Sequence, residues 1–402
     1  MQERSPLVTR VVVSALLVSL MSSLAATASA APRARADRTW MANGRVHALV
    51  RAGDLLLIGG HFTTLLPPRG SRKEPLNVDN LAAIDLSTGK PVRSWRPRVP
   101  GTDATVHALA VSGGTVYVGG RFDRLAGTDV ENLGAVRLSD GVAVAGFAPA
   151  IAGRVFTLLA SPNRLYAGGA FGRVDGASRA KLAAWDLPSR DLSGEWRPRA
   201  VGGAVRDMTF DASENSIFIG GAFAEMAQSG STFTRESVAK VAAQTGRLRT
   251  WRIPTGDIGR PQTGWALEAT RSRLYGGFGR GPNFAAAFEP DGTVGTRFWR
   301  ERLVGNVQAV ELSPNGRRLF LGGHFGLGEL QQHKCGRSLR GLISVRPRTG
   351  KAFCDWIPQL APFGANFDGA WTMLAMGSKL WVGGGFAKIG DREQRNLARF
   401  SI

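Results

Sequence analysis

Beyond its first thirty residues, the chain is a succession of short, alternating apolar segments separated by glycine, aspartate, serine and proline. One stretch shows the pattern clearly, with candidate strands at Val106–Leu109, Thr115–Val118, Leu133–Arg137 and Ala145–Phe147. Alternating segments of this length, bounded by turn residues, are typical of β-strands. Four of them in a row predict one four-stranded antiparallel sheet.

A diglycine followed by an aromatic residue marks each of these units. Seven copies occur, namely Gly59-Gly60-His61-Phe62, Gly119-Gly120-Arg121-Phe122, Gly168-Gly169-Ala170-Phe171, Gly220-Gly221-Ala222-Phe223, Gly322-Gly323-His324-Phe325, Gly383-Gly384-Gly385-Phe386 and, with its phenylalanine one place early, Gly276-Gly277-Phe278. In chain order, their first glycines are 60, 49, 52, 56, 46 and 61 residues apart. Because this is the spacing of propeller blades, the sequence predicts an all-β fold, a single seven-bladed β-propeller of four-stranded antiparallel blades over residues 31–402.

The two ends of the chain predict how the propeller closes. The last unit stops at its third strand, Asn396–Phe400, and lacks the tryptophan strand that other units carry, such as Ser94–Arg98. A matching segment, Arg38–Trp40, stands at the other end of the chain, directly ahead of Val46–Leu49. We expect this N-terminal strand to complete the last blade by sheet hydrogen bonds, which leaves no unpaired edge between the first and last blades.

The repeated residues have structural explanations that come before functional ones. A diglycine allows one blade to approach the next closely, and the aromatic residue fills the space between sheets. A glycine pair can also cradle a phosphate, but that mode needs a following helix N-terminus, and none is predicted here. The Trp-Arg-Pro segments are expected to be edge strands that cover the outer side of the blades, where proline is tolerated.

Three elements of the repeat resemble the delta-60 type β-propeller repeats of secreted bacterial proteins: the aliphatic-Gly-Gly-x-Phe strand, the strand Asn80–Asp85 and the Thr-Gly turn before tryptophan. This resemblance covers the mature chain and implies a fold and an extracellular setting, but no reaction. A weaker similarity to the repeats of quinone-dependent dehydrogenases involves Ala83, Asp85, Thr88, Gly89 and Trp95. The glycine-to-tryptophan spacing is longer here and no adjacent cysteine pair occurs, so we interpret this match as shared blade architecture and predict no cofactor.

The first thirty residues have the composition of a secretory signal peptide. Arg4 and Arg10 precede an apolar run, Val11–Ala26, and Ala28-Ser29-Ala30 forms a cleavage site. The run is short for a membrane span, so we predict that residues 1–30 are removed and that the protein is secreted. An anchor that is not cleaved is the alternative.

Cys335 and Cys354 are the only cysteines of the chain. Disulfides persist outside the cell, so we expect these two residues to be bonded. A redox or metal pair is the alternative, but nothing around them has the spacing of metal ligands, and no metal site is predicted.

The formal net charge is +20, and loss of Arg4, Arg10 and Glu3 with the signal segment leaves +19. Such an excess attracts a protein nonspecifically to anionic surfaces such as wall polymers or lipid headgroups. The basic residues are mostly scattered arginines without interleaved aromatics, which argues against specific nucleic-acid recognition.

No linear catalytic motif involves any of the five histidines, and we assign no catalytic residue. Alignment of the repeat units instead suggests a ring of variable side chains one place after the first valine of each unit: His47, His107, Phe156, Arg206, Trp265, Gln308 and Trp371. If the first strands line the central channel, these residues form a polar and aromatic collar suited to a ligand. The alternative is that each packs within its own blade.

A second candidate ring comes from the residue between the diglycine and the phenylalanine. His61, Arg121 and His324 are its candidate ligand contacts, and the alternative is that they are strand-end residues facing solvent. Two long, basic loops, Thr63–Asn80 and Gly326–Arg340, follow diglycine strands, and variable loops on a rigid scaffold often carry recognition.

These observations predict a secreted, non-catalytic scaffold that binds a glycan, a cell-wall polymer or a protein. The alternative function is an extracellular enzyme, a lyase, hydrolase or quinone-dependent oxidoreductase with its site at the channel mouth. A pocket that gathers acidic groups would favour the enzyme, whereas an aromatic or basic face would favour the binding protein.

Overall fold

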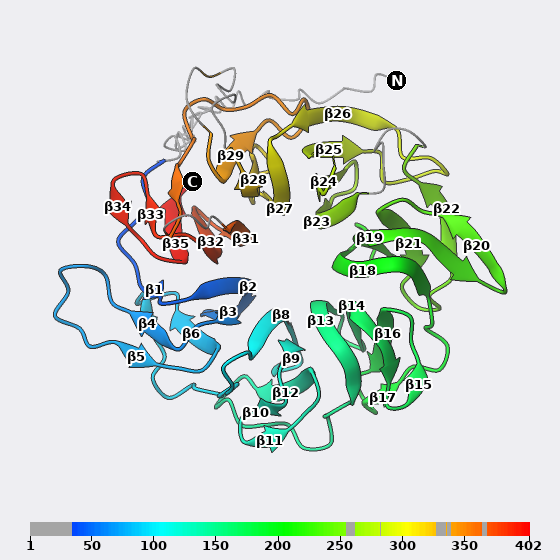
Figure 1. The fold of residues 1–402 in the computed structure, drawn as a ribbon, viewed down its shortest axis with the longest axis horizontal. Coiled ribbons are helices and arrows are strands. Elements are labelled where there is room, and N and C mark those ends of the chain that lie inside the picture. The colour runs from blue at the N-terminus through cyan, green and yellow to red at the C-terminus, as the bar shows by residue number, and fades with distance from the viewer. Residues whose placement is uncertain (1–33, 255–261, 282, 327–334, 336–338, 364–367) are drawn as a thin grey trace, which may run out of the picture. The chain divides into compact units, whose positions relative to one another are not determined.

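Each repeat unit folds into an antiparallel sheet that begins with the strand before the diglycine (Figure 1). The computed structural model describes residues 34–254, 262–281, 283–326, 335, 339–363 and 368–402. The predicted signal segment, residues 1–30, lies outside the described residues. Within the described residues every regular element is a β-strand, because short alternating segments between turn residues cannot build helices.

Seven such sheets follow one another in the described part of the chain. The first three contain β2 (Arg45–Ala52), β3 (Leu55–His61), β6 (Leu81–Asp85) and β7 (Lys90–Pro91); β8 (Thr105–Ser112), β9 (Thr115–Arg121) and β12 (Leu133–Arg137); and β13 (Ile151–Ala160), β14 (Arg164–Val174), β15 (Ala177–Ser178), β16 (Leu182–Asp186) and β17 (Asp191–Leu192). The fourth and fifth contain β18 (Arg199–Phe210), β19 (Ser216–Gln228), β20 (Ser231–Thr234), β21 (Val238–Ala242) and β22 (Leu248–Arg252); and β23 (Thr263–Ala269), β24 (Leu274–Gly279), β25 (Phe284–Phe288) and β26 (Arg297–Arg302). The last two contain β27 (Gly305–Leu312), β28 (Leu319–Phe325) and β29 (Leu342–Val345); and β31 (Gly369–Met376), β32 (Lys379–Gly385) and β35 (Leu397–Ser401).

Short strands form three small separate sheets, each beside one of these seven. They are β1 (Met41–Ala42), β4 (Thr64–Leu66) and β5 (Leu76–Asn77) beside the first sheet; β10 (Arg124–Leu125) and β11 (Thr128–Asp129) beside the second; and β30 (Leu360–Ala361), β33 (Lys388–Ile389) and β34 (Arg392–Glu393) beside the last. The predicted loop Thr63–Asn80 therefore contains two strands of its own, β4 and β5. Most of the loop Gly326–Arg340 lies outside the described residues.

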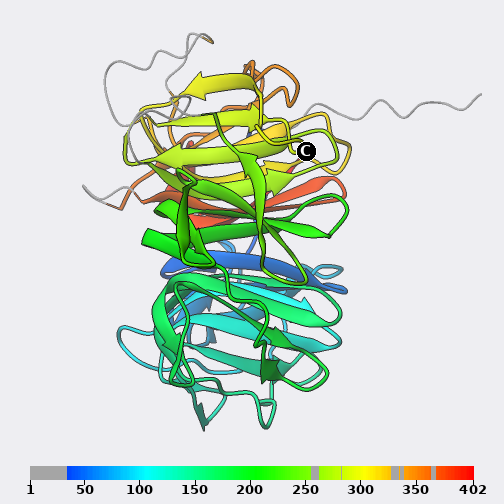
Figure 2. The same cartoon turned by 90° about the vertical axis from the view of Figure 1, so that its right-hand side faces the viewer.

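The first strands of the seven sheets are arranged around one axis. Each of β2, β8, β13, β18, β23 and β27 contacts the first strand of the next sheet, and β31 of the last sheet contacts β2 of the first. Figure 1 shows these strands facing the centre of the ring, and in Figure 2 the red strands of the last sheet lie beside the blue strands of the first. The sheets are therefore blades that close into a ring.

The first glycine of each pair brings neighbouring blades together, as the sequence predicted, except in the fifth blade, where Gly277 takes this place. A Cβ atom on Gly59 would lie 2.5 Å from Cγ1 of Val106 in the next blade. A Cβ on Gly383 in the last blade would lie 2.5 Å from Cγ1 of Val46 in the first. Real Cβ atoms do not approach other atoms this closely, so these positions need glycine.

The second glycine faces the first strand of its own blade. A Cβ on Gly60 would lie 2.1 Å from the carbonyl oxygen of Arg45. In the first blade, Gly60 on β3 pairs with the larger Val46 on β2. In the fifth blade the sizes are reversed, because the large Phe278 on β24 pairs with Gly264 on β23. This exchange explains why the phenylalanine of that repeat comes one place early.

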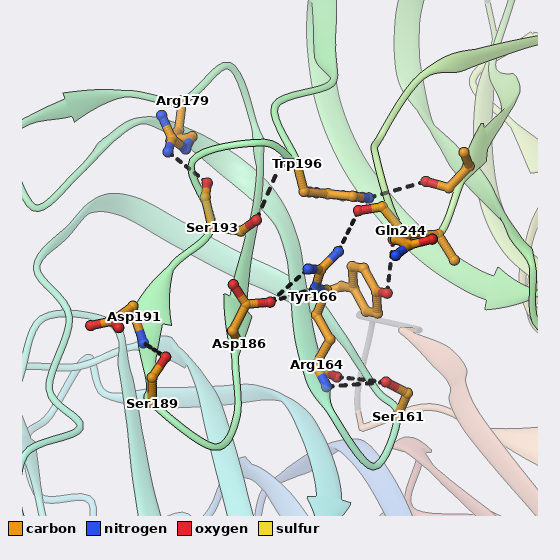
Figure 3. Close-up of polar contacts among 12 residues, drawn as sticks. Ser161, Arg164, Tyr166, Arg179, Asp186, Ser189, Asp191, Ser193, Trp196 and Gln244 are labelled. Carbon is orange, nitrogen blue, oxygen red and sulfur yellow. Dashed lines mark hydrogen bonds and ion pairs between the residues drawn. The ribbon is translucent and has the colours of Figure 1, made fainter.

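The tryptophans of the Trp-Arg-Pro segments are buried between blades, and these segments are not the edge strands that the sequence predicted. Trp196 is fully buried, and its indole Nε1 donates a hydrogen bond of 3.3 Å to the carbonyl oxygen of Ala242 in the next blade (Figure 3). Tyr166 donates to the neighbouring carbonyl of Ala243, and Arg164 bonds both Asp186 and the backbone of the next blade. Three further indoles make the same bond to the next blade: Trp95, Trp251 and Trp299.

Proline decides which of these tryptophans lie in strands. Trp95 and Trp196 follow the short fourth strands β7 and β17, and each has a proline two residues later. Trp251 and Trp299 lie within β22 and β26, which contain no proline. Because proline cannot donate to a sheet ladder, the Trp-Arg-Pro segments leave the sheet where the other two continue it.

The N-terminal segment joins the last blade to the first, but Arg38–Trp40 is not a regular strand. The amide of Asp37 donates to the carbonyl oxygen of Arg399 in β35 at 2.7 Å, and Nδ2 of Asn396 donates to the carbonyl oxygen of Ala42 at 2.9 Å. Trp40 is buried among residues of both blades. β1 then pairs with β4 rather than with the last blade, so side-chain bonds and packing replace much of the predicted sheet pairing.

Asparagine residues connect successive blades in a way that the sequence analysis did not identify. Asn80 has a positive φ of 62°, its Oδ1 accepts from the amide of Phe62, and its Nδ2 donates to the carbonyl oxygen of Val99 at 2.8 Å. Asn132 and Asn396 repeat both bonds. Asparagine tolerates this left-handed backbone, and its amide binds two backbone groups at once.

The predicted disulfide between Cys335 and Cys354 is present, with their Cα atoms 5.3 Å apart. It connects the loop after β28 to the segment after β29, nineteen residues along the chain. A bond over so short a loop restrains the sixth blade locally, and the interblade core remains the main source of stability.

Candidate functional site

A β-bulge in the first strand of every blade presents the predicted collar residues. In the first blade the pairing of β2 with β3 shifts between Val46 and Ala48, which leaves His47 without a partner on β3. The other six first strands shift at the equivalent place and leave unpaired His107, Phe156, Arg206, Trp265, Gln308 and Trp371. Because a bulge turns the extra residue out of the ladder, it can direct this side chain toward the axis.

All seven of these residues line one cavity of about 460 Å³. The cavity receives side chains from the first strand of every blade. Its volume falls in the range of about 300–1,000 Å³ that is usual for small-ligand sites. The structure thus brings the first candidate ring together, and its role in binding stays a prediction.

Six of the seven side chains contact one another in a closed circle. The ring centroids lie 5.2 Å apart for His47 and His107, 5.3 Å for His107 and Phe156, 6.0 Å for Trp265 and Trp371, and 5.3 Å for Trp371 and His47. The Cζ atom of Arg206 completes the circle, 4.1 Å from the ring centroid of Phe156 and 4.8 Å from that of Trp265. Gln308 is the remaining member and lies outside this circle of contacts. We call the seven residues the collar.

Arg206 is the cationic member of the collar. Its guanidinium lies over the rings of Phe156 and Trp265. Burial, with smaller contributions from the charges of Arg280 and Arg154, lowers the pKa of Arg206 to about 10. The side chain nevertheless stays charged at neutral pH, so the cation–π contacts hold a positive charge inside the cavity.

The two histidines of the collar are neutral at physiological pH. Burial lowers the pKa of His47 to about 4, with a smaller contribution from Arg45. Burial, with smaller contributions from His47 and Arg154, lowers the pKa of His107 to about 3. Each ring therefore offers one donor and one acceptor rather than a charge.

This environment predicts an unusual titration of both imidazoles. In NMR spectra of the folded protein, the His47 and His107 signals should titrate near pH 4 and pH 3 and remain those of neutral rings at about pH 5.5. Below about pH 6.5 the unfolded chain takes up protons at these histidines, whereas the folded chain does not until the pH reaches the lower folded-state pKa values. Their contribution to the free energy of unfolding is therefore fully present above about pH 6.5 and is lost as the pH falls toward the folded-state pKa values. His47→Gln and His107→Gln assign the signals. Titration of either ring near pH 6.5 in the folded protein would contradict the buried collar.

Three carboxyl groups line the cavity further along the first strands. Burial raises the pKa of Asp207 to about 7, although the carboxylate accepts hydrogen bonds from the amides of Leu267 at 2.7 Å and Met208 at 2.9 Å. Burial and Asp207 raise the pKa of Glu268 to about 7, and burial and Glu268 raise that of Glu311 well above its ordinary value. The carboxyl groups therefore hold protons at a pH where exposed acids are ionised.

Glu268→Gln tests this cluster through stability. The folded-state pKa lies above the unfolded value, so protonation of Glu268 stabilises the fold below about pH 4.5, and this contribution is lost as the pH rises through 7. Glutamine cannot ionise, so the variant should gain on the order of 2 kcal/mol relative to wild type between about pH 4 and pH 8. Urea denaturation at both pH values measures the difference, with the exposed Glu74→Gln as the control. An equal effect of Glu268→Gln at both pH values would contradict the raised pKa.

The second candidate ring does not line the cavity. Nδ1 of His61 lies 2.9 Å from the carbonyl oxygen of Ala104, and Arg121 forms an exposed ion pair with Asp103 at 3.6 Å. His324 lies at the equivalent place at the end of β28. These residues therefore sit at strand ends outside the collar, and a binding role for them stays a prediction.

Sequence reasoning missed the four ionisable residues that line the cavity outside the collar: Arg154, Asp207, Glu268 and Glu311. The repeat alignment contains a signal for two of them, since Glu268 and Glu311 each stand three places after a collar residue, where four of the other five units carry an aliphatic residue and one carries Thr209. Two acids at a mostly apolar repeat position indicate a special local environment. The position lies on a strand that looks apolar by itself, so the signal appears only when units are compared.

The described part of the chain holds no candidate metal site. Within the described residues, no three histidine, cysteine, aspartate or glutamate side chains come together in a way that could hold a metal ion. The same part of the chain contains no helix with the length and apolar character needed to cross a membrane.

Comparison with known proteins relates the chain to other proteins by fold. No known protein family and no curated protein matches its sequence. The extracellular domain of BT4673 from B. thetaiotaomicron superposes with a TM-score of 0.56 at 12% identity, over 91% of this chain and 39% of that one. U3-55K superposes with a TM-score of 0.56 at 11% identity, over 92% and 99% of the two chains. The β-propeller domain of Cps50 (Swd1) from Myceliophthora thermophila superposes with a TM-score of 0.50 at 12% identity, over 88% and 99%.

The chain is a β-propeller, an all-β protein of antiparallel sheets, as the sequence predicted. It spans about two fifths of the BT4673 chain, and all three likenesses concern the fold alone because the identities are so low. Function must therefore be argued from the cavity.

Proposed function

We propose that this propeller is a non-catalytic extracellular binding protein whose ligand enters the collar cavity. The observation that carries the proposal is the convergence of seven side chains, variable among otherwise similar repeats, on one cavity of about 460 Å³. If these seven residues only packed within their own blades, we would expect them to be alike from one repeat to the next, as the glycines and tryptophans of the repeats are. Aromatic rings dominate the collar and Arg206 is its cation, a combination that suits a glycan, a cell-wall polymer or a segment of a protein.

The extracellular setting is part of the same proposal. It is supported by the composition of residues 1–30, by the Cys335–Cys354 disulfide and by the likeness to an extracellular domain. We further propose that the repeats are of the delta-60 type, which the diglycine strands and the Thr-Gly turns support. No cofactor and no specific nucleic acid are part of the proposed function, and the net charge of the mature chain would add only nonspecific attraction to anionic surfaces.

Binding of the purified protein to isolated cell wall, a glycan panel and anionic vesicles, at low and at high salt, tests this function. We expect saturable binding that survives salt and that weakens about tenfold or more in the triple variant His47→Ala, His107→Ala, Trp371→Ala. The variant to compare is His61→Ala, Arg121→Ala, His324→Ala, which changes the second ring outside the cavity. Wild-type affinity in the folded collar variant would show that the collar is not the site, and a loss in the second-ring variant alone would assign binding to that ring.

A hydrolase or lyase is the second candidate function, because Asp207, Glu268 and Glu311 hold protons near neutral pH inside the cavity. Carboxyl groups with raised pKa values are candidate general acids. Incubation with the glycans that bind, followed by assay of new reducing ends and of unsaturated products, separates the two functions. Turnover that disappears in Glu311→Gln would favour the enzyme, and dye reduction that depends on added quinone would favour the oxidoreductase. Binding without turnover would favour the scaffold.

A further inference from the structure

Arg206 places a positive charge in the cavity without a counter-ion. Within the described residues its guanidinium forms no ion pair and no hydrogen bond, and its Nε atom is buried without a partner. Its Cζ atom lies 4.1 Å from the ring centroid of Phe156 and 4.8 Å from that of Trp265. A partly buried cation that lacks an anion is unfavourable, and cation–π contacts offset only part of this cost. An anion from outside the chain would supply the missing partner.

Two further arginines direct positive charge to the same side of the collar. Arg154 lines the cavity, Arg280 is exposed nearby, and neither is paired with a carboxylate within the described residues. Both charges act on Arg206 strongly enough to lower its pKa. By contrast, Arg45 near His47 is neutralised by an ion pair with Asp368. The unbalanced charge is therefore concentrated on the third, fourth and fifth blades.

Three other polar atoms of the collar are buried without a partner in the described structure: Nε1 of Trp265, Nε1 of Trp371 and Oε1 of Gln308. The Gln308 side chain is only 7% exposed, yet it lines the cavity. Buried polar atoms are rarely left unsatisfied, and two N–H donors beside an amide match a ligand with several hydroxyl groups. These three atoms have almost no exposed surface, so a ligand must displace collar side chains to reach them.

We propose that the collar binds an anionic saccharide, whose acidic group pairs with Arg206, Arg154 and Arg280 and whose hydroxyl groups bond Trp265, Trp371 and Gln308. This inference rests on the proposed function and names the ligand class for the same cavity. The shared chemistry is a sugar ring that carries a carboxylate, phosphate or sulfate. The protons held by Glu268 and Glu311 reduce the negative charge that would otherwise repel such a ligand.

Isothermal titration of the full chain with trigalacturonate and with its neutral methyl ester tests the charge requirement. We expect the acid to bind at least about tenfold more tightly than the ester, and Arg206→Met to lose about tenfold or more for the acid while the ester changes little. Arg206→Lys keeps a charge and should retain part of the preference. Arg271→Met is the matched control, because it removes the same charge from an exposed turn beyond the far end of β23.

The outcomes separate this inference from the proposed function. Preference for the acid that disappears in Arg206→Met and persists in Arg271→Met supports an anionic ligand. Collar-dependent binding of acid and ester with equal affinity overturns the anion requirement and leaves the binding function standing. No collar-dependent binding of either saccharide overturns the inference, and the wider ligand panel then judges the binding function by itself. Titrations with glucose 6-phosphate and glucose 6-sulfate against glucose identify which acid the arginines prefer, and thermal unfolding verifies that each variant is folded.

Discussion

Replacement of Trp196 by alanine should lower the free energy of unfolding by about 3–5 kcal/mol. The indole is fully buried between the third and fourth blades, and it is one of the largest side chains in the interblade core. Alanine would leave a cavity there and would also remove the donor to the carbonyl oxygen of Ala242. Urea denaturation followed by circular dichroism measures the loss.

Two controls separate packing from the hydrogen bond. Trp196→Phe keeps most of the buried area and loses the N–H donor, so it should cost about 1–2 kcal/mol. Arg197→Ala changes the neighbouring exposed residue and should stay within about 0.5 kcal/mol of wild type. If Trp196→Ala were as stable as Arg197→Ala, the tryptophans would not be the connection between blades that the structure indicates.

Gly383→Ala should destabilise the protein by about 1–3 kcal/mol through the contact that closes the ring. The added Cβ would lie 2.5 Å from Cγ1 of Val46 in the first blade and 2.8 Å from Cγ2 of Thr372 in its own. Branched side chains in a packed core cannot move away without strain, so the last and first blades would have to separate slightly. The shift in thermal and urea midpoints measures the effect.

Gly172→Ala in β14 is the matched control, because no atom lies within 4 Å of the added Cβ. It should be neutral or slightly stabilising, since alanine reduces the freedom of the unfolded chain. Val46→Ala removes the atom that Gly383→Ala meets, so the double variant should be less destabilised than the two single effects together. Strict additivity would contradict direct contact between the first and last blades.

The repeat explains why so much of the architecture could be predicted. Gly59 is needed wherever two blades approach, so the same local requirement recurs in each unit and is visible along the chain. The variable position that includes His47 and Trp371 stood out for the opposite reason, since its neighbours are mostly small or aliphatic and it is not. Comparison of units therefore located the collar without any knowledge of three-dimensional structure.

Other features depend on contacts between segments and have no local pattern. The carboxyl groups of Glu268 and Glu311 come from different blades. Burial raises their pKa values, with smaller contributions from Asp207 at Glu268 and from Glu268 at Glu311. Arg154 appeared to be one of many scattered arginines until the structure placed it on the cavity. The partner of each tryptophan was equally hidden, because its acceptor lies in the next blade.

The sequence by itself determined the β-propeller fold, the blade repeats and the seven collar positions, because these follow from periodic residues whose requirements are local. Only the tertiary structure decided where the side chains point and what surrounds them. The bulge that exposes His47 is a shift of register between two paired strands, and the charge state of a buried group depends on its neighbours in space. Neither property belongs to a single segment, so neither can be read from one.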